Sequence, residues 1–134
     1  MTKGGGFNCQ PSPDGKYLYY LQSREGGALW RLELASGKEE VVLPDYKSRN
    51  FKVLSDGIYL CDIGTTSTAV VTPRPGVARF YRFATRRIED LGFTTPRPVS
   101  NNGIELSPDR KWLYFPMLDA QASDLQLAEN LPFR

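Results

Sequence analysis

Three aspartates recur in similar surroundings along the chain and are its first candidates for chemistry. Asp14, Asp56 and Asp109 each lie in a short polar segment that precedes an apolar or aromatic run. The segments form a turn motif made of Ser12, Pro13, Asp14, Gly15, Asp56, Gly57, Ser107, Pro108 and Asp109. Carboxylates can bind a cation, but a Ca²⁺ loop concentrates several oxygen ligands within about 12 residues. One acid per segment instead favours turns, because Pro presets φ, Asp bonds nearby backbone and Gly accepts positive φ.

The residue types for catalysis or metal binding are sparse. The chain has no histidine, so it cannot form a Ser-His-Asp or Cys-His pair, and it lacks a G-x-S-x-G segment. Its two cysteines, Cys9 and Cys61, are expected to be small apolar residues in strands, although one disulfide stays open. Gly4-Gly5-Gly6 is not followed by Gly-Lys-Ser/Thr and is expected to lead into a strand. We therefore expect no enzyme, no metal and no cofactor.

Basic residues interleave with aromatic residues in the second half of the chain. The arginines are Arg74, Arg79, Arg82, Arg86, Arg87 and Arg97, and the aromatic residues among them are Phe80, Tyr81 and Phe83. Such a mixture can bind nucleic acid. However, the net charge is only +2, from 17 basic and 15 acidic residues, which is too small to imply a polyanion partner. We expect the aromatic residues to pack in strands, the arginines to form a solvated rim, and no direct contact with nucleic acid.

The elements that must position these residues are predicted to be short antiparallel strands. Seven Tyr, seven Phe and two Trp favour β-structure, and ten Pro and twelve Gly supply turns. The predicted strands are 7–10, 17–21, 29–34, 39–43, 51–54, 58–63, 77–83, 88–93, 103–106, 112–117 and 125–129. Pro44 is expected to end the fourth strand. Alternation places Trp30, Leu32 and Leu34 on one face of the third strand.

The strands repeat in groups of four, which is the signature of a propeller blade. The fold class is therefore predicted as all-β: one partial β-propeller over 1–134, with blades at about 5–46, 47–96 and 97–134, the last incomplete. Aligning the first two blades requires a one-residue gap after Gly57. Three blades do not close a ring, so we expect a C-terminal part of a longer propeller, its partner being the remaining blades or another protein. The alternative is a small open wedge that self-associates through an exposed blade flank.

The loop from Gly64 to Gly76 is the longest departure from the repeat. Loops carry binding more often than scaffold strands do, so Thr65, Thr66 and Arg74 are the best sequence candidates for a partner contact. No apolar run approaches the roughly 18 residues of a membrane span. The first residues lack the apolar core of a secretory signal. The compartment stays open between cytoplasm and periplasm, depending on any region that precedes Met1.

The segments 12–20 and 107–114 resemble the SPDG-plus-aromatic-strand motif of TolB-like, WD40-like (PD40) bacterial propeller repeats, and Leu29-Trp30-Arg31-Leu32 resembles that family's third strand. The segment 123–130 resembles the closing part of propellers at the C-terminus of winged-helix transcriptional regulators. The resemblance implies a non-catalytic sensor or scaffold module of a larger bacterial signalling or transcription-regulatory protein. Its DNA-binding part would lie N-terminal to this chain. Arg110 replaces the usual Gly, so its turn is expected to tolerate positive φ less well.

Other functions are compatible with the same repeat, because fold does not fix function. One is a periplasmic TolB-like scaffold, which an upstream signal peptide would indicate. Another is the gating propeller of an α/β-hydrolase-type serine peptidase, which a G-x-S-x-G segment in the parent gene would indicate. A third is the sensor half of a receptor kinase, marked by upstream kinase motifs.

Overall fold

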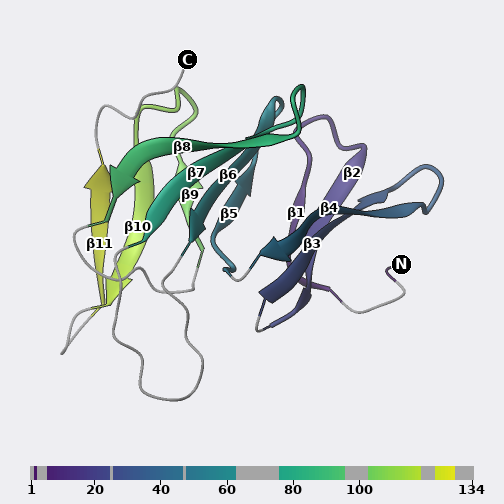
Figure 1. Ribbon diagram of the computed structural model, residues 1–134, viewed down its shortest axis with the longest axis horizontal. Helices are drawn as coiled ribbons and strands as arrows, with labels where there is room; N and C mark the ends of the chain where they lie inside the picture. The colour runs from purple at the N-terminus through teal and green to yellow at the C-terminus, as the bar shows by residue number, and fades with distance from the viewer. Residues whose placement is uncertain are drawn as a thin grey trace.

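The computed structural model describes residues 2, 6–24, 26–46, 48–62, 76–95, 103–118 and 123–128. These residues form eleven β-strands and no helix, which confirms the prediction of an all-β chain. The strands make two four-stranded sheets and one three-stranded sheet, all antiparallel. Figure 1 shows the three sheets side by side, in chain order from right to left. The described part of the chain contains no helix suited to crossing a membrane.

Each sheet is built from strands that follow one another in the sequence. The first sheet contains β1 (Phe7–Pro11), β2 (Tyr17–Ser23), β3 (Gly26–Glu33) and β4 (Glu39–Tyr46). The second contains β5 (Phe51–Val53), β6 (Gly57–Asp62), β7 (Val77–Arg82) and β8 (Arg87–Thr94). The third contains β9 (Glu105–Leu106), β10 (Leu113–Leu118) and β11 (Ser123–Ala128). All eleven predicted strands are present, with shifted ends.

Two details of the first sheet correct the sequence predictions. Pro44 does not end the fourth strand, since β4 runs on to Tyr46. Because β4 lies at the edge of the sheet, the missing N–H of Pro44 can face away from the ladder. Leu34 does not share a strand face with Trp30 and Leu32, because β3 ends at Glu33. Leu34 instead lies in the following turn and is 55% exposed.

The core consists of two apolar clusters, one on each side of the second sheet. Ile58 and Leu60 of β6 belong to the cluster shared with the first sheet, whereas Tyr59 and Cys61 belong to the cluster shared with the third. Successive strand residues point to opposite faces, so β6 is buried on both faces. This explains why its sequence is apolar at nearly every position.

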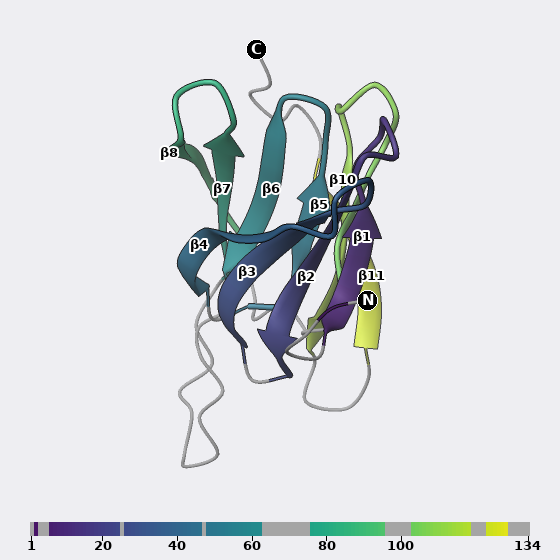
Figure 2. The ribbon, with the colours of Figure 1, turned by 90° about the vertical axis from the view of Figure 1, so that its right-hand side faces the viewer.

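The first sheet has one face without a described sheet against it. Tyr19 and Leu21 of β2 pack toward the second sheet, so the alternating residues point the other way. We call this the outer face; its register-matched residues are Leu18, Tyr20, Trp30, Leu32 and Val41. Figure 2 looks onto this face, with the second sheet behind it.

Polar side chains on the first strands connect neighbouring sheets. The Gln10 amide donates to the Phe51 carbonyl at 2.5 Å and its oxygen accepts from the Val53 N–H at 3.1 Å. Gln10 thus bonds the free edge of β5. One sheet further on, the buried Asn50 accepts from the Gly103 N–H at 2.8 Å. These bonds hold the first strands of successive sheets in register.

Candidate functional site

The first and third copies of the sequence-predicted turn motif have the same hydrogen bonds. In the first, Asp14 Oδ1 accepts from the Ser12 hydroxyl at 2.6 Å and from the Lys16 N–H at 3.1 Å. In the third, Asp109 Oδ1 accepts from Ser107 and Lys111 at the same two distances. The serine hydroxyl bonds lower the pKa of each aspartate, and the backbone N–H adds to this. Both carboxylates are therefore occupied in holding their own turns.

The second copy is built differently. Six residues, 12–17, connect the register pair Pro11 and Leu18, but only four residues, 54–57, connect Val53 and Ile58. The turn is thus shorter by two residues, and the predicted one-residue gap was wrong. A two-residue difference keeps the faces of β2 and β6 equivalent.

In this shorter turn, the Asp56 carboxylate does not make the serine and backbone N–H bonds that Asp14 and Asp109 make in theirs. Its carboxylate accepts from two nitrogens of Arg110, at 2.7 and 3.0 Å, across the interface between the second and third sheets. The Arg110 hydrogen bonds hold the pKa of Asp56 below its ordinary value, against the opposing effect of burial. Arg110 adopts φ 59°, the left-handed conformation that its turn was expected to tolerate less well with arginine than with glycine. The residue takes this conformation and uses its side chain to join two sheets.

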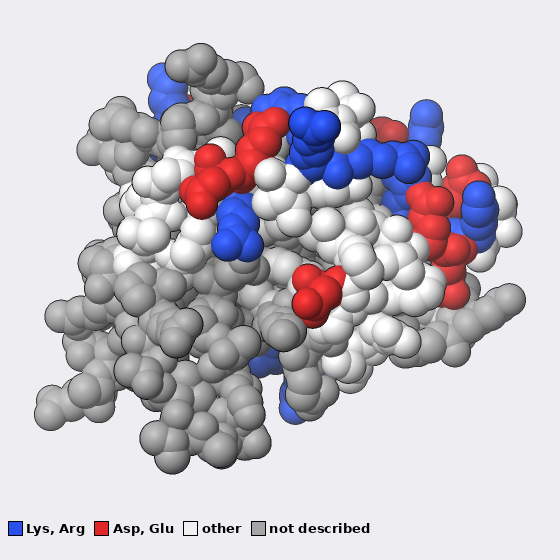
Figure 3. All heavy atoms as spheres, in the orientation of Figure 1, with Lys and Arg blue, Asp and Glu red and all other residues white. Residues whose placement is uncertain are grey.

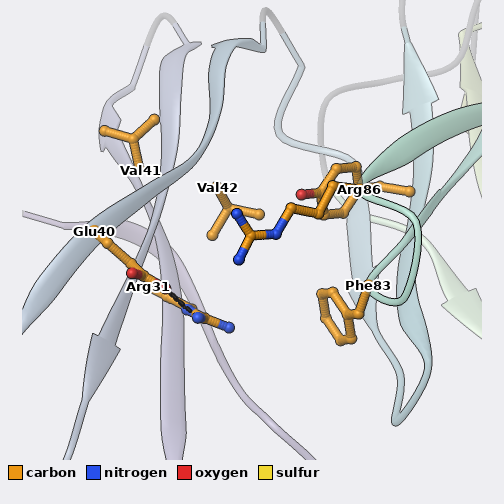
Figure 4. Close-up of a pocket in the computed structure, with 7 residues that line it drawn as sticks. Arg31, Glu40, Val41, Val42, Phe83 and Arg86 are labelled. Carbon is orange, nitrogen blue, oxygen red and sulfur yellow. Dashed lines mark hydrogen bonds and ion pairs between the residues drawn. The ribbon is translucent and has the colours of Figure 1, made fainter.

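The interface between the first and second sheets is open at the same end. Two cavities of about 270 and 210 Å³ lie there and share Arg31 and Phe83 in their linings. We call them together the groove. The larger cavity is lined by Arg31, Glu40, Val41, Val42, Tyr81, Phe83 and Arg86, most of which Figure 4 shows. The smaller one is bounded by the turns at Ser12–Asp14 and Leu54–Ser55. The shortened second turn carries no side chain equivalent to Arg110, so no ion pair of that kind joins the two turns here.

Arg31 is held in place in the groove by neighbours of the first sheet. It pairs with Glu40 on β4 and lies over the Tyr17 ring, with Cζ 4.6 Å from the ring centroid. Burial acts to lower the pKa of Arg31, but its bonds to Tyr19 and Glu40 raise it on balance. Arg31 is therefore a fixed cation.

Arg86 enters the larger cavity from the second sheet. It ends the turn between β7 and β8, and its side chain extends between Val42 and Phe83 toward Arg31 (Figure 4). Among the described residues, no hydrogen bond or ion pair engages its guanidinium. Two guanidinium groups thus converge on one cavity, with a single carboxylate, that of Glu40, in its lining.

Aromatic rings form the wall of the groove on the second sheet. Phe83 stacks on Tyr19 across the interface, with centroids 6.0 Å apart and an interplanar angle of 17°. Phe83 also meets Tyr81 edge to face at 6.1 Å. Such contacts stabilise both sheets and fix the ring positions. The groove therefore combines cations with a rigid apolar wall.

The arginines named from the sequence have separate roles. Arg82 pairs with Glu89 at 2.8 Å and lies over Phe80, whereas Arg86 points into the groove. On the described face in Figure 3, basic and acidic side chains are interspersed. Sequence reasoning did not identify Arg31 or Glu40, because their position beside Arg86 depends on how two sheets pack. The only local signal was that Ala84-Thr85-Arg86 parallels Ala35-Ser36-Gly37, with arginine in place of glycine.

The remaining sequence candidates fall elsewhere. Thr65, Thr66 and Arg74 lie outside the described residues. Cys9 is exposed in β1, Cys61 is buried in β6, and no disulfide joins them. Within the described ranges, no group of three or more His, Cys, Asp or Glu side chains is arranged to hold a metal ion.

Comparison of the chain with family models, with curated proteins and with solved structures found no significant match. The structure by itself shows an all-β fold with three antiparallel sheets. The function of the chain is therefore argued from its own geometry.

Proposed function

We propose that the chain is a non-catalytic interaction module formed by part of a β-propeller, whose outer face packs against a further blade-like sheet. The observation that supports this most strongly is the repetition of one interface. The first sheet packs on the second, and the second on the third, through apolar residues of successive sheets. Stacking of sheets in this manner around an axis is how propellers bury both faces of each blade.

Equivalent positions build both interfaces. Ile58 and Leu60 of β6 face the preceding sheet, as do Leu113 and Phe115 of β10. The register pairs place Leu18 and Tyr20 of β2 at the same positions in the first sheet. These two residues lie on the outer face, together with Trp30. The outer face thus has the residues that elsewhere in this chain receive a neighbouring sheet.

Exposed apolar surface also favours an additional sheet at this face. Val41, opposite Trp30 on β4, is 43% exposed and extends the apolar surface. It also borders the larger cavity of the groove, but its side chain points away from Arg31 and Arg86 in Figure 4. Either a second copy of the chain or more blades of a longer protein would provide such a sheet.

Solution mass measurements on the isolated chain test this proposal. We expect association that increases with protein concentration in size-exclusion chromatography with light scattering, because Val41 leaves apolar surface exposed on the outer face. Val41→Lys should reduce it by placing a charge on that face. Ile88→Lys is the matched control, since Ile88 is 49% exposed on β8, the last strand of the second sheet. A chain that stays monomeric at every concentration, or equal effects of the two variants, would overturn the proposal.

A further inference from the structure

Two arginines occupy left-handed backbone positions that glycine occupies in the equivalent turns of the first sheet. Arg110 has φ 59° where Gly15 has 71°, and Arg86 has φ 54° where Gly37 has 72°. The second pair of turns also shares its closing bond, because the Arg86 and Gly37 N–H groups each donate at 2.8 Å to the carbonyl four residues earlier. Left-handed φ is unfavourable for residues other than glycine. Strain retained at a particular position motivates a search for a functional reason.

The side chain of Arg110 has a clear anionic partner. It binds both carboxylate oxygens of Asp56 in a two-pronged arrangement, the geometry that makes arginine suited to carboxylates. Arg86 has the same strained backbone but no anionic partner among the described residues. Its guanidinium instead extends into the larger cavity of the groove.

The charged side chains that line this cavity have a net charge of one positive unit, which one further negative group would balance. Arg31 and Arg86 supply two positive charges, and Glu40 supplies one negative charge that pairs with Arg31. A single carboxylate would balance the remaining charge. A phosphate would bring up to two negative charges close to Glu40, and a cation would meet Arg86, so both are less suited to this lining.

The uncharged part of the lining indicates what the carboxylate is attached to. Phe83 and Tyr81 form an aromatic wall, and Val42 of β4 faces them across a cavity of about 270 Å³. Small-molecule sites commonly combine such apolar walls with a few placed polar groups.

We propose that the groove between the first and second sheets binds a small organic acid, with its carboxylate on Arg86 and its apolar part against Phe83 and Val42. Arg31 lies beyond Arg86 in the cavity and adds positive potential there, while Glu40 keeps Arg31 in place. This site lies between two sheets of the chain itself, so it does not depend on any further blade.

Titration of the full 134-residue chain by two-dimensional ¹⁵N–¹H NMR tests the proposal. The probe is phenylacetate, which has one carboxylate on an aromatic body, and phenylacetamide is its neutral counterpart. We expect saturable shifts of the backbone amides of Val42, Phe83 and Arg86 with phenylacetate. The amide should bind at least about tenfold more weakly, because a charge-assisted pair is lost.

Three variants separate binding from folding. Arg86→Gly should weaken phenylacetate binding about tenfold while leaving the chain at least as stable, because glycine accepts the left-handed turn. Arg86→Gln should weaken binding similarly. Arg87→Gln makes the same charge change next to it, but Arg87 does not line the cavity, so binding should be unchanged.

Three results would each contradict the proposal. They are equal affinity for the acid and its amide, unchanged affinity in folded Arg86→Gly, and shifts that map to residues outside the groove. Self-association of the chain is measured separately and decides only the propeller proposal, so the two can fail independently.

Discussion

Arg110 binds Asp56 across the interface between the second and third sheets, with both carboxylate oxygens engaged at 2.7 and 3.0 Å. The pair joins a turn of one sheet to a turn of the next, and it requires Arg110 to hold φ 59°. The side chains are 28% and 42% exposed, so the pair itself contributes only about 0.5–1 kcal/mol. This gain is comparable in size to the backbone cost of the left-handed residue.

Two substitutions of Arg110 should therefore differ in a characteristic way. Both Arg110→Ala and Arg110→Gly remove the ion pair, but only glycine relieves the left-handed backbone. We expect Arg110→Ala to be less stable than Arg110→Gly by about 1 kcal/mol. Urea unfolding followed by tryptophan fluorescence measures the difference. If alanine were equally stable, the positive φ would carry no cost at this turn.

The turn aspartates should make stability depend on pH in the acid range. Hydrogen bonds from Arg110 lower the pKa of Asp56, and hydrogen bonds from serine hydroxyls lower those of Asp14 and Asp109. In the unfolded chain these carboxyls titrate near their ordinary value of about 4. Below that pH the unfolded state binds more protons than the folded state, so stability rises with pH there. The contribution is complete above the unfolded pKa and is lost as the pH falls through the folded values.

The measurement is the free energy of unfolding between about pH 2.5 and 6, a range that spans the ordinary carboxyl pKa. Asp56→Asn removes one titrating group, so its curve should rise less steeply than that of the natural chain. Arg110→Gly should flatten the curve by a similar amount, because it leaves Asp56 without the partner that lowers its pKa. Parallel curves for all three proteins would mean that this ion pair contributes nothing to acid stability.

The strands could be predicted because their signals are local. Alternation, aromatic content and turn residues lie within a few positions of each other, as in Ser12–Lys16, and need no distant contact. The length of the second turn could not be predicted, because Asp56-Gly57 looks like Asp14-Gly15 while the pairing of Val53 with Ile58 sets the register. The groove was missed for a related reason. It depends on two sheets packing face to face, and the sequence places no local mark on Arg31.

Gln10 should be a stabilising residue despite its position at the end of the first strand. Its amide provides both a donor and an acceptor to the edge of β5, at the Phe51 carbonyl and the Val53 N–H. Gln10→Ala leaves both backbone groups without this partner, which we expect to cost about 1–2 kcal/mol. Gln10→Glu keeps the acceptor and loses the donor.

The glutamate variant makes the Gln10 test specific. A carboxylate can still accept from Val53 but repels the Phe51 carbonyl, so Gln10→Glu should be no more stable than Gln10→Ala at neutral pH. Protonation of the introduced carboxylate at low pH restores a donor. The difference in stability between Gln10→Glu and the natural chain should therefore become smaller. Thermal unfolding at two pH values measures this. A glutamate variant that matches the natural chain at neutral pH would contradict the role assigned to the donor.

Gly57 should be among the least replaceable residues of the second sheet, because it begins β6 at a point of close approach. A Cβ there would overlap the Tyr81 carbonyl oxygen and the Phe80 ring. Neither neighbour can move easily, since both belong to β7, and Phe80 is 4% exposed. We expect Gly57→Ala to cost about 1–3 kcal/mol through overpacking.

Gly15→Ala is the matched control, because it destabilises the chain through backbone strain and not through a steric clash. Gly15 has φ +71° and open space around the position of a Cβ, so alanine there meets only backbone strain of about 1 kcal/mol. Gly57→Ala should therefore be the more destabilising of the two in urea unfolding, and it should also disturb the Phe83 N–H bond to the Asp56 carbonyl, which is 3.0 Å long. Amide hydrogen exchange of Phe83 measures that second effect. Phe83 forms the wall of the groove. Faster exchange of its amide in Gly57→Ala but not in Gly15→Ala would show that the shortened turn maintains the shape of the groove. Equal exchange in both variants would show that the shape of the groove does not depend on this turn.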